Sequence, residues 1–302
     1  MRCIFCKENS DNSKSIEHII PESIGNKRWI LPKGVVCDKC NNYFAIKVEA
    51  PIMNHSSFSN IRAYYQVPNK KNKFPILQGI IGGTNIDIGL KLNKENKIEI
   101  NPLRQKRLAE FNSEYSKFLN GEEFNPFIFK VDIEPPQKIM SRFLAKMGLE
   151  MFAYRFLESG SSPESIVDEK FFDPIRNYVR YGRNPETWVY KSRRIFPMDT
   201  LMKDKTEKYV QVGYGCDLFH TKRRETYFFF LFYGVEFIIN IGGNSIRGYE
   251  EWLNENNHIS PILERTGSKV ISRKEGKEIR YYIEGELSSK EGILFDLKQM
   301  NK

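Results

Sequence analysis

Four cysteines near the start of the chain form its most specific pattern. Cys3 and Cys6 make one Cys-x-x-Cys pair, and Cys37 and Cys40 make a second. Two such pairs, separated by roughly thirty residues, are the ligand pattern of a tetrahedral zinc site in which four thiolates hold one metal ion. The segment that carries them is too short to bury a sufficient apolar core, so a structural metal is physically expected. The sequence therefore predicts one structural zinc ion on these four cysteines.

An acidic residue and a histidine lie between the two cysteine pairs. Glu17 and His18 are adjacent and precede two isoleucines and Pro21, which is consistent with a short strand that leaves into a loop. Phosphodiester hydrolysis needs a nucleophilic water and a cation that neutralises the phosphate. A neutral imidazole is a natural base for that water, and Glu17 offers a carboxylate to a hard divalent cation. Consecutive strand residues point to opposite faces, so both groups reach one phosphate only if the strand is locally distorted.

Together with the cysteines, these residues resemble the HNH (ββα-metal) endonucleases with a zinc-stapled finger, a group that includes phage Holliday-junction resolvases. The resemblance is confined to the cysteine-bearing segment. It implies that Glu17 is the acidic metal ligand and His18 the general base. It also implies that Asn41, directly after the fourth cysteine, is the second protein ligand. Two oxygen ligands leave room for waters and substrate oxygens, which suits magnesium or manganese better than zinc. In this family, cleavage leaves 5′-phosphate and 3′-hydroxyl ends.

Each of these assignments has a simpler structural alternative. His18 would then only pack against the zinc finger, and Asn41 would only cap a helix. Asn42 could exchange roles with Asn41, and Asn26 could orient His18, as an Asn in this loop does in some family members. Other branches of the family use a histidine ligand near the position of His55, but its long spacing from Asn41 favours a plain surface histidine here.

The composition is that of a soluble globular protein with a basic bias. The 302 residues carry a formal net charge of +9, and a positive field attracts polyanions such as nucleic acids. The alternative is that the positive charge only reflects the lysine-rich composition that an AT-biased genome produces. Only Cys216 lies outside the two cysteine pairs, so the cysteine usage indicates a reducing compartment and no disulfide framework.

Neither a leader nor a membrane span is expected from the sequence. The first Cys-x-x-Cys pair, the first cysteine knuckle, begins at Cys3, and we therefore expect no signal peptide before it. The most apolar run, 227–241, is interrupted by Gly234 and Glu236 and is too short to cross a bilayer. Its aromatic and β-branched residues favour two buried strands of one hairpin. We therefore expect a soluble, cytoplasmic protein without a membrane partner.

The fold class predicted is α+β, with a small zinc-stapled ββα-metal domain at 1–56 and a larger α+β domain at 57–302. In the first domain, the strand at Glu17 pairs with a return strand at Val35–Val36. A helix over 41–49 follows and is stopped by Pro51. The beginning of the second domain, 57–134, is predicted to be a basic, β-rich linker region of strands and turns.

The strongest helix expected in the second domain runs from Pro135–Pro136 to about Leu157, because its apolar residues recur at i, i+3 and i+4. Lys138, Arg142 and Lys146 form a cationic ridge along it, which we interpret as a solvated face, with nucleic-acid contact as the alternative. A last helix is expected near 288–297. The basic segment Asn69–Lys73, which we call the basic arm, could bind the phosphates of a nucleic acid. The alternative is that it is a solvent-exposed loop without a ligand.

The preferred hypothesis is that the protein is a metal-dependent HNH endonuclease that nicks or cuts DNA. The sequence does not decide whether it forms an oligomer or binds a regulatory protein. Stand-alone bacterial proteins of this kind often belong to phage-defence systems or mobile elements. The rival reading is a non-catalytic zinc-finger module that binds nucleic acid or protein. A binding-only finger has no need for Glu17, His18 and Asn41 in their family positions. A ribonuclease would use the same residues, so RNA remains an alternative substrate.

Overall fold

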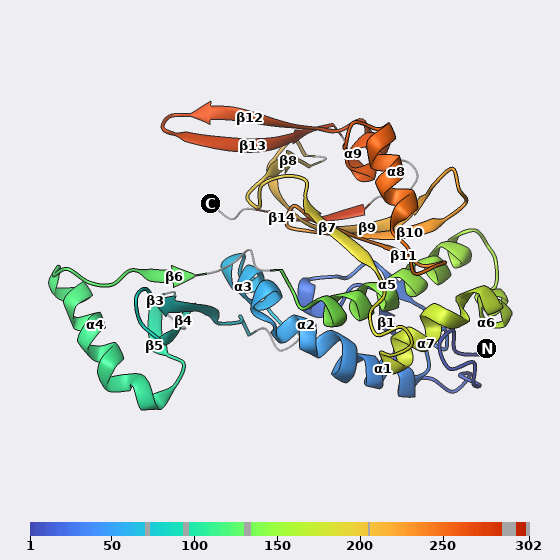
Figure 1. The fold of residues 1–302 in the computed structure, drawn as a ribbon, viewed down its shortest axis with the longest axis horizontal. Coiled ribbons are helices and arrows are strands. Elements are labelled where there is room, and N and C mark those ends of the chain that lie inside the picture. Colours follow the sequence, from blue (N-terminus) through green and yellow to red (C-terminus); the bar gives the residue numbers. More distant parts are fainter. Residues whose placement is uncertain (70–72, 93–96, 130–133, 205, 286–293, 300–302) are drawn as a thin grey trace. The chain divides into compact units, whose positions relative to one another are not determined.

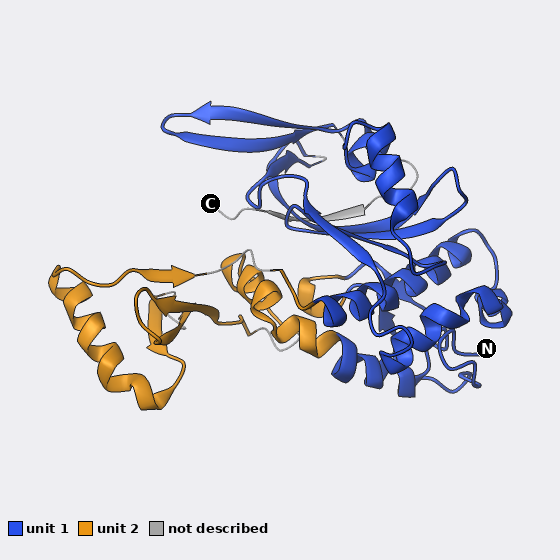
Figure 2. Cartoon of the chain, viewed as in Figure 1, with its two compact units in different colours: residues 1–20, 27–48, 137–302 blue, residues 21–26, 49–136 orange. Residues whose placement is uncertain are grey.

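The structure is a computed structural model, and it describes residues 1–69, 73–92, 97–129, 134–204, 206–285 and 294–299. Its contacts divide the chain into two compact units (Figure 2). Unit 1 comprises residues 1–20, 27–48 and 137–302, and unit 2 comprises residues 21–26 and 49–136. These boundaries differ from those of the predicted domains, because the cysteine-bearing segment shares a unit with the C-terminal half of the chain.

The N-terminal segment has the predicted order of two strands and a helix. Strand β1 (Glu17–His18) pairs antiparallel with β2 (Ile30–Leu31), and helix α1 (Asp38–Phe44) follows. The return strand predicted at Val35–Val36 was wrong. The backbone N–H of Ile4 instead donates to the carbonyl of Val35 at 3.0 Å. These two valines are buried against the first knuckle because the chain turns there to bring the two cysteine pairs together.

The helix that begins in this segment also extends beyond its predicted end. A π-helical turn covers Ala45–Glu49, and α2 (Ala50–Asn54) holds Pro51 in its first turn. Proline is tolerated there, because the N–H that it lacks would have no intrahelical partner in the first turn. The predicted stop at Pro51 was therefore wrong.

The main sheet of unit 1 has the strand order β12-β13-β8-β9-β10-β11-β7, with β14 paired to β9 (Figure 1). All of its pairings are antiparallel except the parallel contact of β13 with β8. Its strands are β7 (Tyr190–Arg194), β8 (Leu201–Lys203), β9 (Tyr209–His220), β10 (Thr226–Phe232), β11 (Val235–Asn240), β12 (Lys269–Glu275), β13 (Glu278–Glu284) and β14 (Leu294–Gln299).

Two sequence predictions fall on this sheet. The buried hairpin expected in 227–241 is confirmed as β10 and β11, joined through Tyr233 and Gly234. Both turn residues have positive φ, 44° and 83°, as a two-residue turn between twisted strands requires. The helix expected near 288–297 was wrong over Leu294–Leu297, which lies in β14. Residues 288–293 lie outside the described part of the chain.

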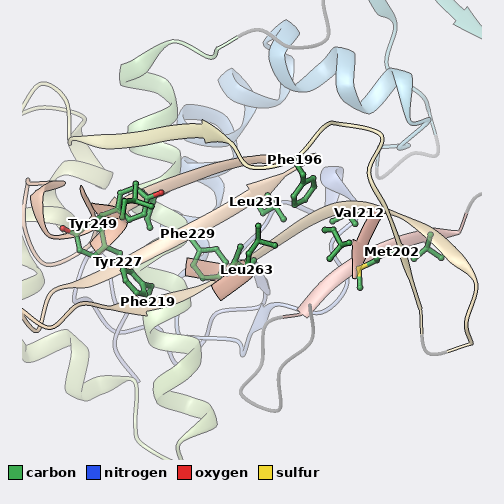
Figure 3. Close-up of a cluster of buried hydrophobic side chains, with 14 residues drawn as sticks. Phe196, Met202, Val212, Phe219, Tyr227, Phe229, Leu231, Tyr249 and Leu263 are labelled. Atoms are coloured by element: carbon green, nitrogen blue, oxygen red, sulfur yellow. The ribbon is translucent and has the colours of Figure 1, made fainter. Parts of the chain in front are cut away.

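Strand β10 is buried on both of its faces. Phe228 and Phe230 face helix α5 (Gln137–Glu158), and the ring of Phe143 meets that of Phe230 edge to face at 6.2 Å. Phe229 and Leu231 face the opposite way, into a cluster with residues of α8 (Arg247–Glu255) and α9 (Pro261–Thr266) (Figure 3). A strand covered on both faces needs a continuous apolar run, which explains the sequence of this strand.

Helix α5 confirms the strong helix predicted from Pro135, and a glycine lets it approach the sheet closely. A Cβ on Gly148 would lie 2.6 Å from Cγ2 of Ile241 and 3.1 Å from Cβ of Phe228. Two shorter helices follow, α6 (Glu164–Asp168) and α7 (Asp173–Tyr181). The close approach of α5 fixes the depth at which its polar residues enter the interior of unit 1.

This close approach makes Gly148→Ala an informative variant. The new methyl group would gain about 1 kcal/mol of helix propensity, but overpacking at such distances costs about 1–3 kcal/mol. We expect a net loss of stability in urea unfolding. Gly148→Ala should cost less stability in an Ile241→Ala background than in the wild type, because Ile241→Ala removes the Cγ2 methyl group at the point of overlap. A single variant as stable as the wild type would contradict this packing.

Unit 2 contains a four-stranded antiparallel sheet in the order β5-β4-β3-β6, and helices that were not predicted from the sequence. Its strands are β3 (Leu77–Ile81), β4 (Asp87–Leu92), β5 (Ile98–Pro102) and β6 (Phe127–Phe129). Helices α3 (Ser56–Tyr64) and α4 (Leu108–Asn120) were predicted as part of a β-rich linker, and this was wrong. The helical spacing of Leu108, Phe111, Tyr115 and Phe118 was a usable signal. In the predicted basic arm, Lys70 and Lys71 lie outside the described residues.

Candidate metal centre and active site

The four predicted zinc ligands lie together. The Sγ atoms of Cys3, Cys6, Cys37 and Cys40 are all within 4.8 Å of one another, and those of Cys6 and Cys37 are 3.6 Å apart. Tetrahedral Zn–S bonds of about 2.3 Å place the sulfurs about 3.8 Å apart, so the cluster fits one zinc ion. Backbone N–H groups support the sulfurs, since Cys37 donates to Sγ of Cys3 and Cys40 to Sγ of Cys37, each at 3.4 Å.

The four thiols influence one another strongly at these distances. A hydrogen bond from Cys40 lowers the pKa of Cys3 to about 5, and burial raises the pKa of Cys6 to about 11. The interaction with Cys3 also raises the pKa of Cys40 above its ordinary value. Without a metal ion, the cluster would therefore contain both protonated thiols and thiolates. A bound zinc ion would stabilise all four as thiolates, which is the chemistry that this donor set supplies.

The two candidate catalytic side chains of strand β1 differ in exposure. Its pairing with β2 sets Glu17 opposite Leu31 and His18 opposite Ile30. Glu17 is buried, with 5% of its side chain exposed, whereas His18 is partly exposed. The alternation along a strand explains this difference.

Asn41 ties helix α1 to the chain just before β1. Its Nδ2 donates to the carbonyl of Ile16 at 3.0 Å. The use of Nδ2 as a donor leaves Oδ1 as the amide atom that can accept a hydrogen bond or bind a cation. The alternative that Asn41 caps a helix was wrong, because the N-cap of α1 is Cys37, whose sulfur accepts the N–H of Cys40.

His55 and Asn26, two further candidates from the sequence, belong to unit 2, whereas Asn42 belongs to unit 1 with Asn41. His55 is the N-cap of α3, and its Nδ1 accepts the backbone N–H of Ser57 at 3.3 Å. This hydrogen bond gives His55 a structural role within unit 2. Asn26 is fully buried in the same unit.

Comparison with known proteins agrees with the two-strand, one-helix segment and its cysteine cluster. A family model described as HNH endonuclease matches residues 3–57. This segment is an HNH endonuclease domain. No curated protein and no solved structure matches the chain. The predicted resemblance is thus confirmed, as is the α+β class with an HNH domain followed by a larger α+β region.

A buried lysine from α5 reaches the candidate metal ligand of the HNH domain. Nζ of Lys146 lies 2.6 Å from Oε1 of Glu17 and 2.9 Å from Oε2 of Glu150. Lys146 and Glu150 are completely buried. The prediction that Lys146 belongs to a solvated ridge was wrong. Buried charges require well-placed partners of opposite sign, and here one ammonium group bridges two carboxylates.

Arg142, one turn earlier on α5, joins the HNH domain to α7. Its guanidinium group donates to the carbonyls of Val179 and Arg180, each at 2.8 Å, and to the hydroxyl of Tyr43 at 2.7 Å. It also lies over the ring of Tyr43 at 5.5 Å from the centroid. Arg142 is therefore a partly buried connector, and of the three predicted ridge residues only Lys138 is exposed.

The first cysteine knuckle is also bound to the C-terminal half of unit 1. Nε of Arg176, on α7, donates to the carbonyl of Ile4 at 2.6 Å. Lys7 pairs with Asp173 at 2.6 Å, and Arg2 pairs with Asp168 at the same distance. These contacts explain why the two cysteine pairs share a compact unit with the helices of the C-terminal half.

Proposed function

We propose that this protein is a metal-dependent DNA endonuclease in which His18 is the general base and Glu17 and Asn41 hold one magnesium or manganese ion. The supporting observation is the HNH domain itself, whose fold keeps His18 partly exposed and whose Asn41 braces the strand that carries Glu17. A zinc site built from thiolates suits a reducing, cytoplasmic environment. None of the described helices is long and apolar enough to span a membrane.

His18 is suited to accept a proton from water. Its Nδ1 is shielded from solvent, so Nε2 is the ring nitrogen that can meet the water. The water oxygen forms the new bond to phosphorus as Nε2 takes its proton, and the bond from phosphorus to the 3′ oxygen breaks. A divalent cation on Glu17 and Asn41 would neutralise charge on the phosphate and the leaving oxygen. A proton then completes the 3′-hydroxyl, and the other end keeps the 5′-phosphate.

A basic and aromatic surface at the end of α7 supports a nucleic-acid substrate. The guanidinium groups of Arg180 and Arg183 lie 5.0 Å and 5.8 Å from the ring centroid of Tyr181, which is 51% exposed. Arg183 is exposed, and Arg180 is partly buried. Guanidinium groups beside an exposed aromatic ring can bind phosphate and stack on bases. We define these three residues as the α7 surface.

The α7 surface gives a test of substrate binding that does not depend on cleavage. Arg180→Ala with Arg183→Ala should weaken DNA binding across all sequences and lower the slope of log K against log[salt] by roughly one unit per lost phosphate contact. The control is Lys269→Ala with Lys274→Ala, which removes the same charge from exposed positions on β12. If both double variants behave alike, the α7 surface contributes only net charge.

The proposed activity is tested with purified, zinc-loaded protein. Supercoiled plasmid, linear duplex and RNA are each incubated with magnesium or manganese, and with EDTA as the control. Cleavage of plasmid or duplex that requires the divalent cation supports the proposal. Cleavage of RNA alone would establish the ribonuclease reading instead. Binding without cleavage of any of the three would leave the non-catalytic zinc-finger module.

A further inference from the structure

The buried group of Glu17, Lys146 and Glu150 lies where the proposed cation ligand enters the interior of unit 1. All three side chains are at least 95% buried, and the ammonium group lies within 3 Å of both carboxylates. Two carboxylates and one ammonium group leave one net negative charge when all are ionised. This arrangement already provides Glu17 with a cation, and that cation is covalently attached to α5.

A divalent ion on Glu17 would lie close to this ammonium group. Their repulsion is weakly screened because the group is buried, so the two cations compete for the same carboxylate. The lysine ammonium group is a compact charge on a flexible four-carbon stem and can shift position. Glu150 lies one helical turn from Lys146 and can keep it paired when Glu17 binds another cation.

We propose that Lys146 is a tethered cation that competes with the divalent ion for Glu17 and sets the affinity of the site for that ion, with Glu150 holding the lysine when it is displaced. This inference rests on the proposed function, because it requires Glu17 to be a cation ligand. Lys146 is thus a positioning residue of the site, although it lies far from the HNH domain in sequence, with 129 positions separating it from Glu17.

Direct measurement of Mn²⁺ binding to zinc-loaded protein without DNA, by calorimetry or electron paramagnetic resonance, tests this inference. Lys146→Met keeps most of the length of the side chain but removes its charge, and should tighten Mn²⁺ binding at least tenfold. It should also enlarge the rise in Tm that Mn²⁺ produces. Glu150→Gln removes the alternative partner of the lysine and should weaken Mn²⁺ binding. Because a change in net charge alone would act in the same two directions, the decisive comparison is a variant that removes Lys146 and keeps the net charge.

A further variant covers the case in which Lys146→Met fails to fold because two carboxylates are left buried. Lys146→Met with Glu150→Gln keeps the net charge of the group unchanged and should also bind Mn²⁺ more tightly than the wild type. Unchanged or weaker binding in the folded Lys146 variants would overturn the inference.

Glu17→Gln separates failure of this inference from failure of the proposed function. If Glu17→Gln loses Mn²⁺ binding but the Lys146 variants do not tighten it, only the tethered cation is refuted. If Glu17→Gln leaves Mn²⁺ binding unchanged, Glu17 is not a ligand. That result would refute both the tethered cation and the ligand set of the proposed function.

Discussion

His18→Ala should abolish the nicking of supercoiled plasmid while the protein keeps its zinc, its fold and its affinity for DNA. The substitution removes the proposed base but neither a cysteine ligand nor a residue of the α7 surface. Loss of a general base typically lowers the rate about 10²–10⁴-fold, which in a plasmid assay appears as no detectable product. Zinc content, thermal unfolding and DNA binding are measured on the same preparation.

His220→Ala is the matched control for this variant. His220 is an exposed histidine of the same unit, at the end of β9, and its Nδ1 lies 3.1 Å from Oγ1 of Thr226. It should cleave plasmid at the wild-type rate. Full activity in His18→Ala, measured beside the wild type and this control, would refute the proposed mechanism. The zinc-finger binding module would then be the better reading.

Cys37→Ser should release the zinc ion and destabilise unit 1 as a whole. Cys37 is a predicted zinc ligand and also the N-cap of α1. Structural zinc sites contribute apparent binding energies of about 10–16 kcal/mol, which is comparable with the whole stability of a typical protein, about 5–15 kcal/mol. Because Arg176 and Lys146 bind Ile4 and Glu17 to the rest of unit 1, the loss should spread beyond the N-terminal segment.

Elemental analysis and urea unfolding measure this result. The wild type should contain one zinc ion per chain, and Cys37→Ser should contain less than one and unfold at a lower urea concentration. Cys216→Ala is the control, because Cys216 is buried in β9 outside the cysteine cluster and its loss should leave the zinc content unchanged. A Cys37→Ser protein that retains one zinc ion per chain would show that the metal site is built differently.

Several features of this protein could be predicted from the sequence because short-range geometry controls them. A Cys-x-x-Cys pair places two thiolates on one tight turn, so its spacing nearly determines its chemistry. The hairpin of β10 and β11 follows in the same way from a continuous apolar run with a glycine turn. The proposed roles of His18, Glu17 and Asn41 stay predictions, although Asn41 does reach the chain beside Glu17.

The surroundings of Glu17 were decided only by the tertiary structure. The spacing of Lys138, Arg142 and Lys146 describes one stripe of a helix, and a cationic stripe usually faces water. The burial of Lys146 depends on two features of the tertiary structure. These are the close packing of α5 on the sheet at Gly148, and a carboxylate 129 positions away. The spacing of the cysteines in the sequence therefore predicted the metal cluster. Long-range packing, by contrast, determined that the carboxylate of Glu17 pairs with the ammonium group of Lys146.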